Sequence, residues 1–170
     1  MDEKFLMPIK KIPNDDSGTF PSVDLRAIDP ACRIDEEHLG SSSCHAVKTA
    51  KVSDWETTPL PAKRTKIVRD RRFSTEEIQC MRSGLIPAVM EDKWFIYWQD
   101  DTLFFHRSWT GFCIYVVRFT ADTECYHMIE ADVNRDPEQY TEVSVERDTK
   151  IISFLIDVVL LRRPGEFPSE

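Results

Sequence analysis

The chain has no hydrophobic run long enough to cross a bilayer. Its longest apolar stretch runs from Ile151 to Leu161 and is interrupted by Ser153 and Asp157, whereas a spanning helix needs about 20 apolar residues. The first residues carry acidic groups where a signal peptide carries basic ones, and no apolar segment follows them. We therefore expect a cytoplasmic protein that does not associate with a membrane.

The chain also lacks an excess of positive charge. Its formal net charge is −8, and such a field repels nucleic-acid backbones, so a nucleic-acid partner is not expected. The basic run from Lys63 to Arg72 is a local exception. Runs of this kind are typical of a solvated strand or linker, although this one also offers charge for binding an anion.

Paired cysteines are missing as well. The five cysteines are an odd number without a C-x-x-C pair, which predicts neither a disulfide framework nor a zinc site. No cofactor motif is present, so we expect no cofactor.

The length and composition predict one globular domain. The chain has 170 residues, of which 41% are hydrophobic and 31% charged. Prolines and turn signals crowd its beginning, which predicts an irregular N-terminal arm over residues 1–62. The patterned part, residues 63–163, is expected to form the core domain, and residues 164–170 a loose tail.

Two helices are predicted. Ser74 and Glu77 have the spacing of a capping box and Gly84 follows as a stop signal, so a helix is expected over about residues 75–83. Asp148 is the expected cap of a second helix over about residues 149–162, which is apolar on nearly all sides and should be buried.

Four aromatic and β-branched runs are joined by short turns, and they cover residues 93–98, 103–106, 112–119 and 125–131. This pattern predicts an α+β fold in which an antiparallel β-meander of about four or more strands packs against the two helices. The strands are apolar on both sides. The second face should therefore be covered by the arm, a partner subunit or a ligand.

The turn between the second and third predicted strands groups the polar residues best suited to a binding site. Arg107 stands beside the hydroxyls of Ser108 and Thr110, a combination that suits a phosphate or carboxylate. Alternatively, Arg107 pairs with Glu91 or Asp92 and the hydroxyls bond to the turn backbone. The candidate ligand-binding residues are Lys93, His106, Arg107, Ser108, Trp109 and Thr110.

No catalytic or metal site is predicted. His106 and Ser108 lack the G-x-S-x-G context of a serine nucleophile. A metal site formed by His127, His106 and either Cys113 or Cys125 is the alternative, but no spacing here matches a zinc site, and core packing and hydrogen bonding explain these residues better.

The segments Arg72–Tyr97 and Leu103–Gly111 resemble an uncharacterised bacterial domain that occurs alone and beside ADP-ribosylglycohydrolase-like domains. The resemblance covers about residues 70–120. It implies a bacterial source and a nucleotide or ADP-ribose context, and it supplies no catalytic residue.

Three hypotheses follow. The first is a non-catalytic module that binds a phosphate-bearing small molecule or a protein partner. The second is a small hydrolase acting on a nucleotide or ADP-ribose linkage, with His106 as general acid/base assisted by Glu91 or Asp92. The third is an interaction protein that forms a homodimer through an apolar sheet face.

Overall fold

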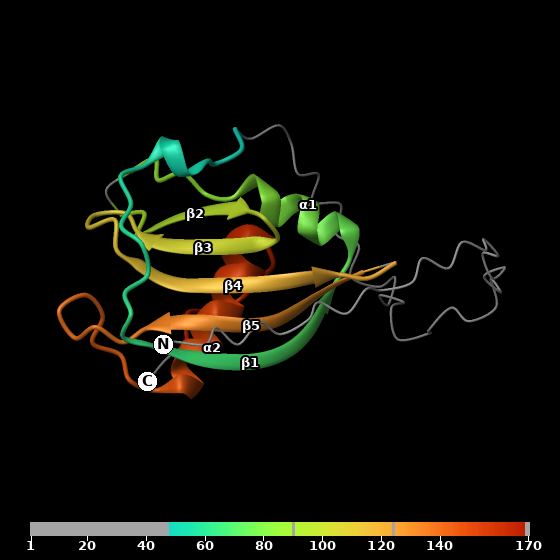
Figure 1. Ribbon diagram of the computed structural model, residues 1–170. Coiled ribbons are helices and arrows are strands. Elements are labelled where there is room, and N and C mark those ends of the chain that lie inside the picture. Colours follow the sequence, from blue (N-terminus) through green and yellow to red (C-terminus); the bar gives the residue numbers. More distant parts are fainter. Residues whose placement is uncertain (1–47, 90, 124, 169–170) are drawn as a thin grey trace, which may run out of the picture. The chain divides into compact units, whose positions relative to one another are not determined.

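One antiparallel sheet organises the part of the chain that the computed structural model describes, namely residues 48–89, 91–123 and 125–168 (Figure 1). Its strand order is β1-β5-β4-β3-β2. The strands are β1 Arg64–Phe73, β2 Trp94–Gln99, β3 Thr102–Arg107, β4 Cys113–Ala121 and β5 Tyr126–Asn134. The α+β meander expected from the sequence is confirmed.

The basic run forms strand β1. The sequence alone was compatible with either a strand or a linker here. The run becomes an edge strand because its long side chains find partners on neighbouring elements. Lys66 Nζ lies 2.7 Å from a carboxylate oxygen of Glu130 on β5, and Arg71 forms two hydrogen bonds with Asp157. Much of the positive charge of this run is thus neutralised within the protein.

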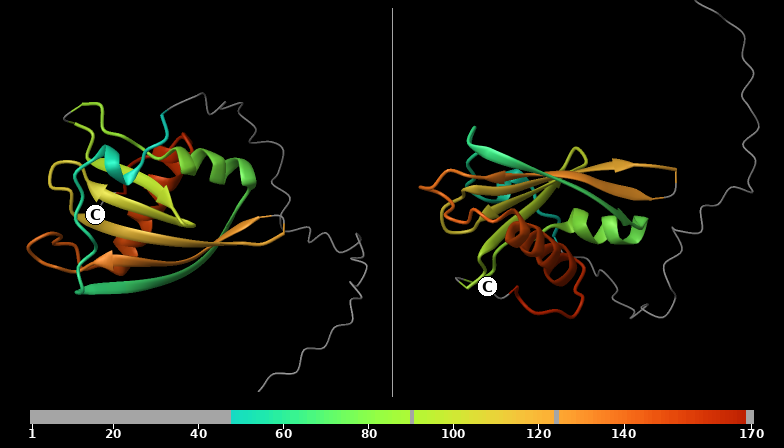
Figure 2. Two further views of the ribbon diagram at one scale, coloured as in Figure 1. Left: turned by 45° about the horizontal axis from the view of Figure 1, so that its top comes forward. Right: turned by 90° about the horizontal axis from the view of Figure 1, so that it is seen from below.

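Both helices lie on one face of the sheet, as Figure 2 shows edge-on. Helix α1, Thr75–Ser83, has the predicted bounds and buries Ile78 and Met81. Its capping box is formed: the backbone N–H of Ser74 donates to Glu77 Oε2 at 2.8 Å, and that of Glu77 donates to Ser74 Oγ at 3.3 Å. Cys80 on this helix is disulfide-bonded, a bond that the cysteine pattern did not predict.

The second helix begins earlier than the sequence predicted. Helix α2 runs Val145–Phe154 and continues as a π-helical segment, η4, Leu155–Leu160. Its cap is Ser144, whose Oγ accepts from the backbone N–H of Arg147 at 3.2 Å. Asp148 is therefore not the cap; it lies inside the helix and is fully buried.

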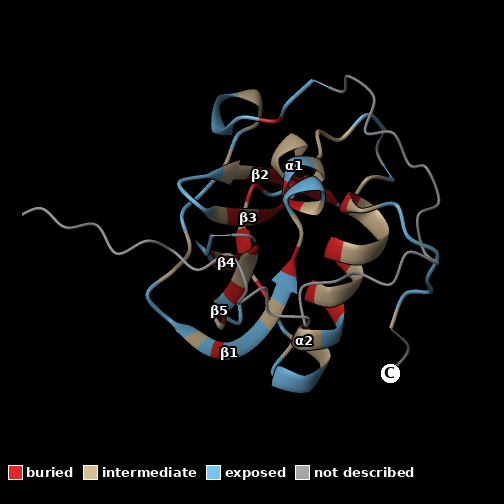
Figure 3. Ribbon diagram, turned by 90° about the vertical axis from the view of Figure 1, so that its right-hand side faces the viewer, coloured by how far each residue is buried: buried red, intermediate tan, exposed pale blue. Residues whose placement is uncertain are grey.

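The main core fills the space between the sheet and these helices. In Figure 3 the buried parts of α2 are on the side of the helix that faces the strands. Leu103, Tyr115, Val117 and Leu155 are completely shielded from solvent there.

The end of the predicted arm covers part of the opposite face. Ala50 is buried against Phe95 and Tyr97 of β2, and Trp55 stacks on Phe95 with ring centroids 6.0 Å apart. The Nε1–H of Trp55 also donates to the carbonyl of Ser108 at 2.8 Å. Residues 1–47 of the arm lie outside the described residues.

The same face of β4 and β5 is charged instead of apolar. Arg118 on β4 donates to Glu130 at 2.9 Å and to Asp132 at 2.8 Å, both on β5.

Among the described residues, no helix combines the length and apolar character needed to span a membrane.

Candidate anion-binding site

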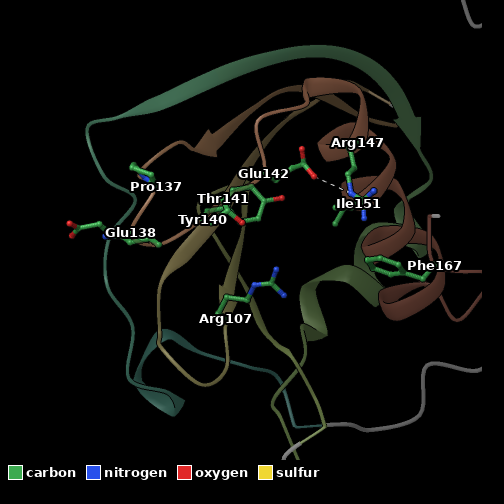
Figure 4. A pocket seen from close by; sticks show the side chains of 10 residues that line it. Arg107, Pro137, Glu138, Tyr140, Thr141, Glu142, Arg147, Ile151 and Phe167 are labelled. Atoms are coloured by element: carbon green, nitrogen blue, oxygen red, sulfur yellow. Dashed lines mark ion pairs between the residues drawn. The ribbon is translucent and has the colours of Figure 1, made fainter. Parts of the chain in front are cut away.

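Two adjoining cavities open on the helix-bearing side of the sheet, each of about 420 Å³. The first, called the polar cavity, is lined by Arg107, Pro137, Glu138, Gln139, Tyr140, Thr141, Glu142, Arg147, Ile151 and Phe167 (Figure 4). The second, called the apolar cavity, is lined by Leu85, Glu91, Asp92, Lys93, Trp94, Arg107, Ile151, Phe154, Leu155, Val159 and Phe167. The two cavities share Arg107, Ile151 and Phe167.

Arg107 occupies the junction of the two cavities. It is the last residue of β3, and its guanidinium carbon lies 4.3 Å from the centre of the Trp94 ring. This cation–π contact fixes the group without using its N–H donors. Among the described residues the guanidinium has no ion-pair or hydrogen-bond partner, and in Figure 4 it points toward the space in front of Tyr140.

Asp92, one of the two carboxylates that the sequence offered as partners for Arg107, is engaged elsewhere. Asp92 Oδ2 accepts from the backbone N–H groups of Ala88 at 2.8 Å and Val89 at 3.2 Å. Thus Arg107 forms no ion pair with Asp92, nor with Glu91, the alternative left open by the sequence.

Glu142, across the polar cavity, is engaged in the same way. Its Oε1 accepts from the backbone N–H of Ser144 at 2.8 Å, and its Oε2 lies 3.1 Å from Arg147 Nε. Hydrogen bonds from the backbone N–H groups of Ser144 and Val143, followed by the charge of Arg147, hold the pKa of Glu142 below its usual range. The positive charge of Arg107 therefore remains available to a ligand.

A buried polar network supports the wall of the polar cavity. The hydroxyl of Tyr140 donates to Asp148 Oδ1 at 2.7 Å, and that of Tyr115 reaches the same oxygen at 3.0 Å. Arg135 donates to Asp148 Oδ2 at 2.6 Å. Burial raises the pKa of Tyr140, so the network fixes a neutral hydroxyl and the loop that carries it.

The six predicted site residues do not all converge. Arg107 and Lys93 line the cavities, and Lys93 is exposed at the rim of the apolar cavity. Ser108 Oγ instead donates to the carbonyl of Asp92 at 2.6 Å, and Thr110 Oγ1 accepts from the backbone N–H of Phe112 at 3.4 Å. Both hydroxyls thus bond to backbone groups, Thr110 within the turn and Ser108 in the segment that precedes β2.

Trp109 and His106 also lie outside the two cavities. Trp109 is 73% exposed at the tip of the turn. His106 is buried on the opposite sheet face, where its ring stacks on Tyr97 with centroids 5.6 Å apart. Its Nδ1 lies 3.0 Å from the carbonyl of Gly111, which makes Nδ1 the protonated nitrogen.

Burial sets the charge state of this histidine. Burial lowers the pKa of His106, and the hydrogen bond to Gly111 only partly opposes this shift. The Nε2 atom is enclosed and has no hydrogen-bond partner among the described residues. The ring is therefore neutral near pH 7.

Sequence reasoning missed the walls contributed by the second half of the chain. Tyr140 and Arg147 lie between the fourth predicted strand and the second predicted helix, and Phe167 lies in the predicted loose tail. One signal was present: Asp148 is a charged residue at the edge of a segment that is apolar nearly all round. Such a residue needs a buried partner when the segment packs.

His127 contacts Asp70 at 3.2 Å and Cys125 at 3.5 Å, in keeping with the hydrogen bonding that the sequence favoured over a metal site for this residue. Within residues 48–168, apart from the two gaps, no group of three or more His, Cys, Asp and Glu side chains is placed to hold a metal ion.

No family model, curated protein or solved structure matches this chain.

Proposed function

We propose that this protein is a non-catalytic module that binds a phosphate-bearing small molecule at Arg107. The observation that carries the proposal is the guanidinium at the junction of two cavities without an ionic partner. Cavities of about 420 Å³ fall within the usual size range of small-molecule sites. This size favours a small ligand over a protein partner.

Arginine suits a phosphate group for a geometric reason. Its planar guanidinium presents donors in a fork that matches two phosphate oxygens. Lys93 adds a second cation at the rim of the apolar cavity, and it too has no ion-pair partner among the described residues. The resemblance to a domain found beside ADP-ribosylglycohydrolase-like domains agrees with a phosphate-bearing ligand.

Isothermal titration with inorganic phosphate, phenyl phosphate, AMP and ADP-ribose tests the proposal. Arg107→Gln should weaken the binding of the best of these ligands by about 10-fold to 100-fold, because a charge-assisted hydrogen bond contributes about 1.5–3 kcal/mol. The matched control is Arg69→Gln, which removes the same charge from an exposed site that lines neither cavity. Equal affinities in the two variants, or no binding by the wild type, would reject the proposal.

The other two hypotheses gain no support from the geometry. His106, the general acid/base of the hydrolase hypothesis, lines neither cavity and bonds to Gly111. The dimer hypothesis rested on an uncovered apolar sheet face. That face is covered over β2 by Ala50 and Trp55, and it carries ion pairs over β4 and β5.

A further inference from the structure

The apolar cavity differs from the polar one in its walls. Aliphatic and aromatic side chains make up most of its lining, and these are Leu85, Trp94, Ile151, Phe154, Leu155, Val159 and Phe167. The charged residues Glu91 and Lys93 are exposed, which places them at the rim. A group that enters this cavity from the position of Arg107 therefore meets mainly apolar surface.

The tail completes this wall. The rings of Phe154 on α2 and Phe167 in the tail meet edge to face, with centroids 5.2 Å apart. Phe167 is nevertheless 56% exposed, so a large apolar surface at the opening is left in water. A ligand with an apolar part would shield this surface, and an inorganic anion would not.

We infer that the ligand is amphipathic, with its phosphate at Arg107 and an apolar body directly attached to it that fills the apolar cavity. This inference rests on the proposed function and narrows it. A nucleotide would present a ribose, whose hydroxyls find few partners on these walls. An alkyl or aryl phosphate matches both the cation and the surface beside it.

A homologous series of ligands tests the inference directly. Isothermal titration with methyl, butyl and hexyl phosphate keeps the anionic group constant and extends only the apolar body. The Kd should fall with chain length, by up to about fourfold for each methylene that becomes buried. Glycerol phosphate, which has a short polar body, should bind no better than methyl phosphate.

Two valines on the same π-helical segment provide a matched pair of variants. Val159 lines the apolar cavity, whereas its neighbour Val158 lines a separate cavity beside Gly165. Val159→Thr adds a hydroxyl of nearly the same shape and should weaken hexyl phosphate binding several-fold while leaving methyl phosphate unchanged. Val158→Thr should change neither affinity.

A tail variant keeps the test valid if Val159→Thr impairs folding. Phe167→Ala removes an exposed side chain from the cavity wall and should also flatten the dependence of Kd on chain length. A Kd independent of chain length, with phosphate binding still sensitive to Arg107→Gln, would overturn this inference and leave the proposed function standing. If no alkyl phosphate binds in an Arg107-dependent way, both fail.

Discussion

Arg107 and Arg135 are both partly shielded from solvent, but only Arg135 pairs with a carboxylate. Arg135 donates to Asp148, whose carboxylate is fully buried, so this ion pair stabilises a charge that has no access to water. Arg107 rests on the face of Trp94 and neutralises no carboxylate. One arginine supports the fold, and the other is available to a ligand.

This difference predicts opposite results for two alanine substitutions. Arg107→Ala should lower the free energy of unfolding by only about 0.5–1 kcal/mol, the value of a cation–π contact near the surface. Arg135→Ala should cost about 3–5 kcal/mol, because it leaves the buried carboxylate of Asp148 without its cation. Urea denaturation measures both. A loss of several kcal/mol in Arg107→Ala would mean that this residue pairs within the protein.

His106 predicts a pH dependence of stability. Its folded pKa is lowered by burial, so below the unfolded value of about 6.5 the unfolded chain binds a proton that the folded protein does not. The stabilisation is complete above pH 6.5 and is lost as the pH falls through the folded pKa, with a slope of at most about 1.4 kcal/mol per pH unit.

Denaturation at pH 5.0, 6.0 and 7.0 measures this dependence in the wild type, His106→Leu and His127→Gln. The decline between pH 7.0 and 5.0 should be smaller in His106→Leu, whereas His127→Gln should retain it. An identical decline in the wild type and His106→Leu would show that another group is responsible.

At the scale of elements, α1 is the part whose stability depends most clearly on local sequence. Ser74→Ala removes the oxygen that accepts from Glu77 N–H and should cost about 1 kcal/mol. Gln79→Ala, an exposed substitution within the same helix, should stay within about 0.5 kcal/mol. Equal free energies of unfolding for the two variants in chemical denaturation would contradict the role of the cap.

The two helices also show what sequence alone can predict. The bounds of α1 were predictable because its capping box and stop signal lie within a dozen neighbouring residues. The start of α2 was not, because both Ser144 and Asp148 can cap a helix. Asp148 is drawn into the core by Arg135 and two tyrosines, a tertiary arrangement that no local pattern reveals.

The candidate site was predictable to a similar extent. Arg107 was chosen as a candidate ligand-binding residue from the composition of its turn, and in the structure it lines two cavities. Four of the other predicted residues, His106, Ser108, Trp109 and Thr110, are neighbours of Arg107 in sequence. Successive residues of a strand face opposite sides of a sheet, which separates His106 from Arg107. Tyr140 and Phe167 are far from Arg107 in sequence, so only the fold brings them to the cavities.

At the scale of the whole molecule, the sheet has a different environment on each face. The helix-bearing face holds the core and the two cavities. The other face is covered over β2 by the end of the N-terminal arm, where Trp55 both stacks on Phe95 and bonds to the carbonyl of Ser108. Ser108 belongs to the turn that follows Arg107, so this cover is linked to the position of the site.

The last prediction concerns this cover. Trp55→Ala should lower the free energy of unfolding by roughly 2–4 kcal/mol, because it removes a large ring packed on Phe95. Val143→Ala is the control, since Val143 is 80% exposed and its truncation should change stability by less than about 0.5 kcal/mol. Deleting residues 1–60 should expose Phe95 and Tyr97 to water and increase the fluorescence of a bound hydrophobic dye. If the truncated protein without residues 1–60 were as stable as the full chain and bound no dye, the arm would have no part in covering the sheet.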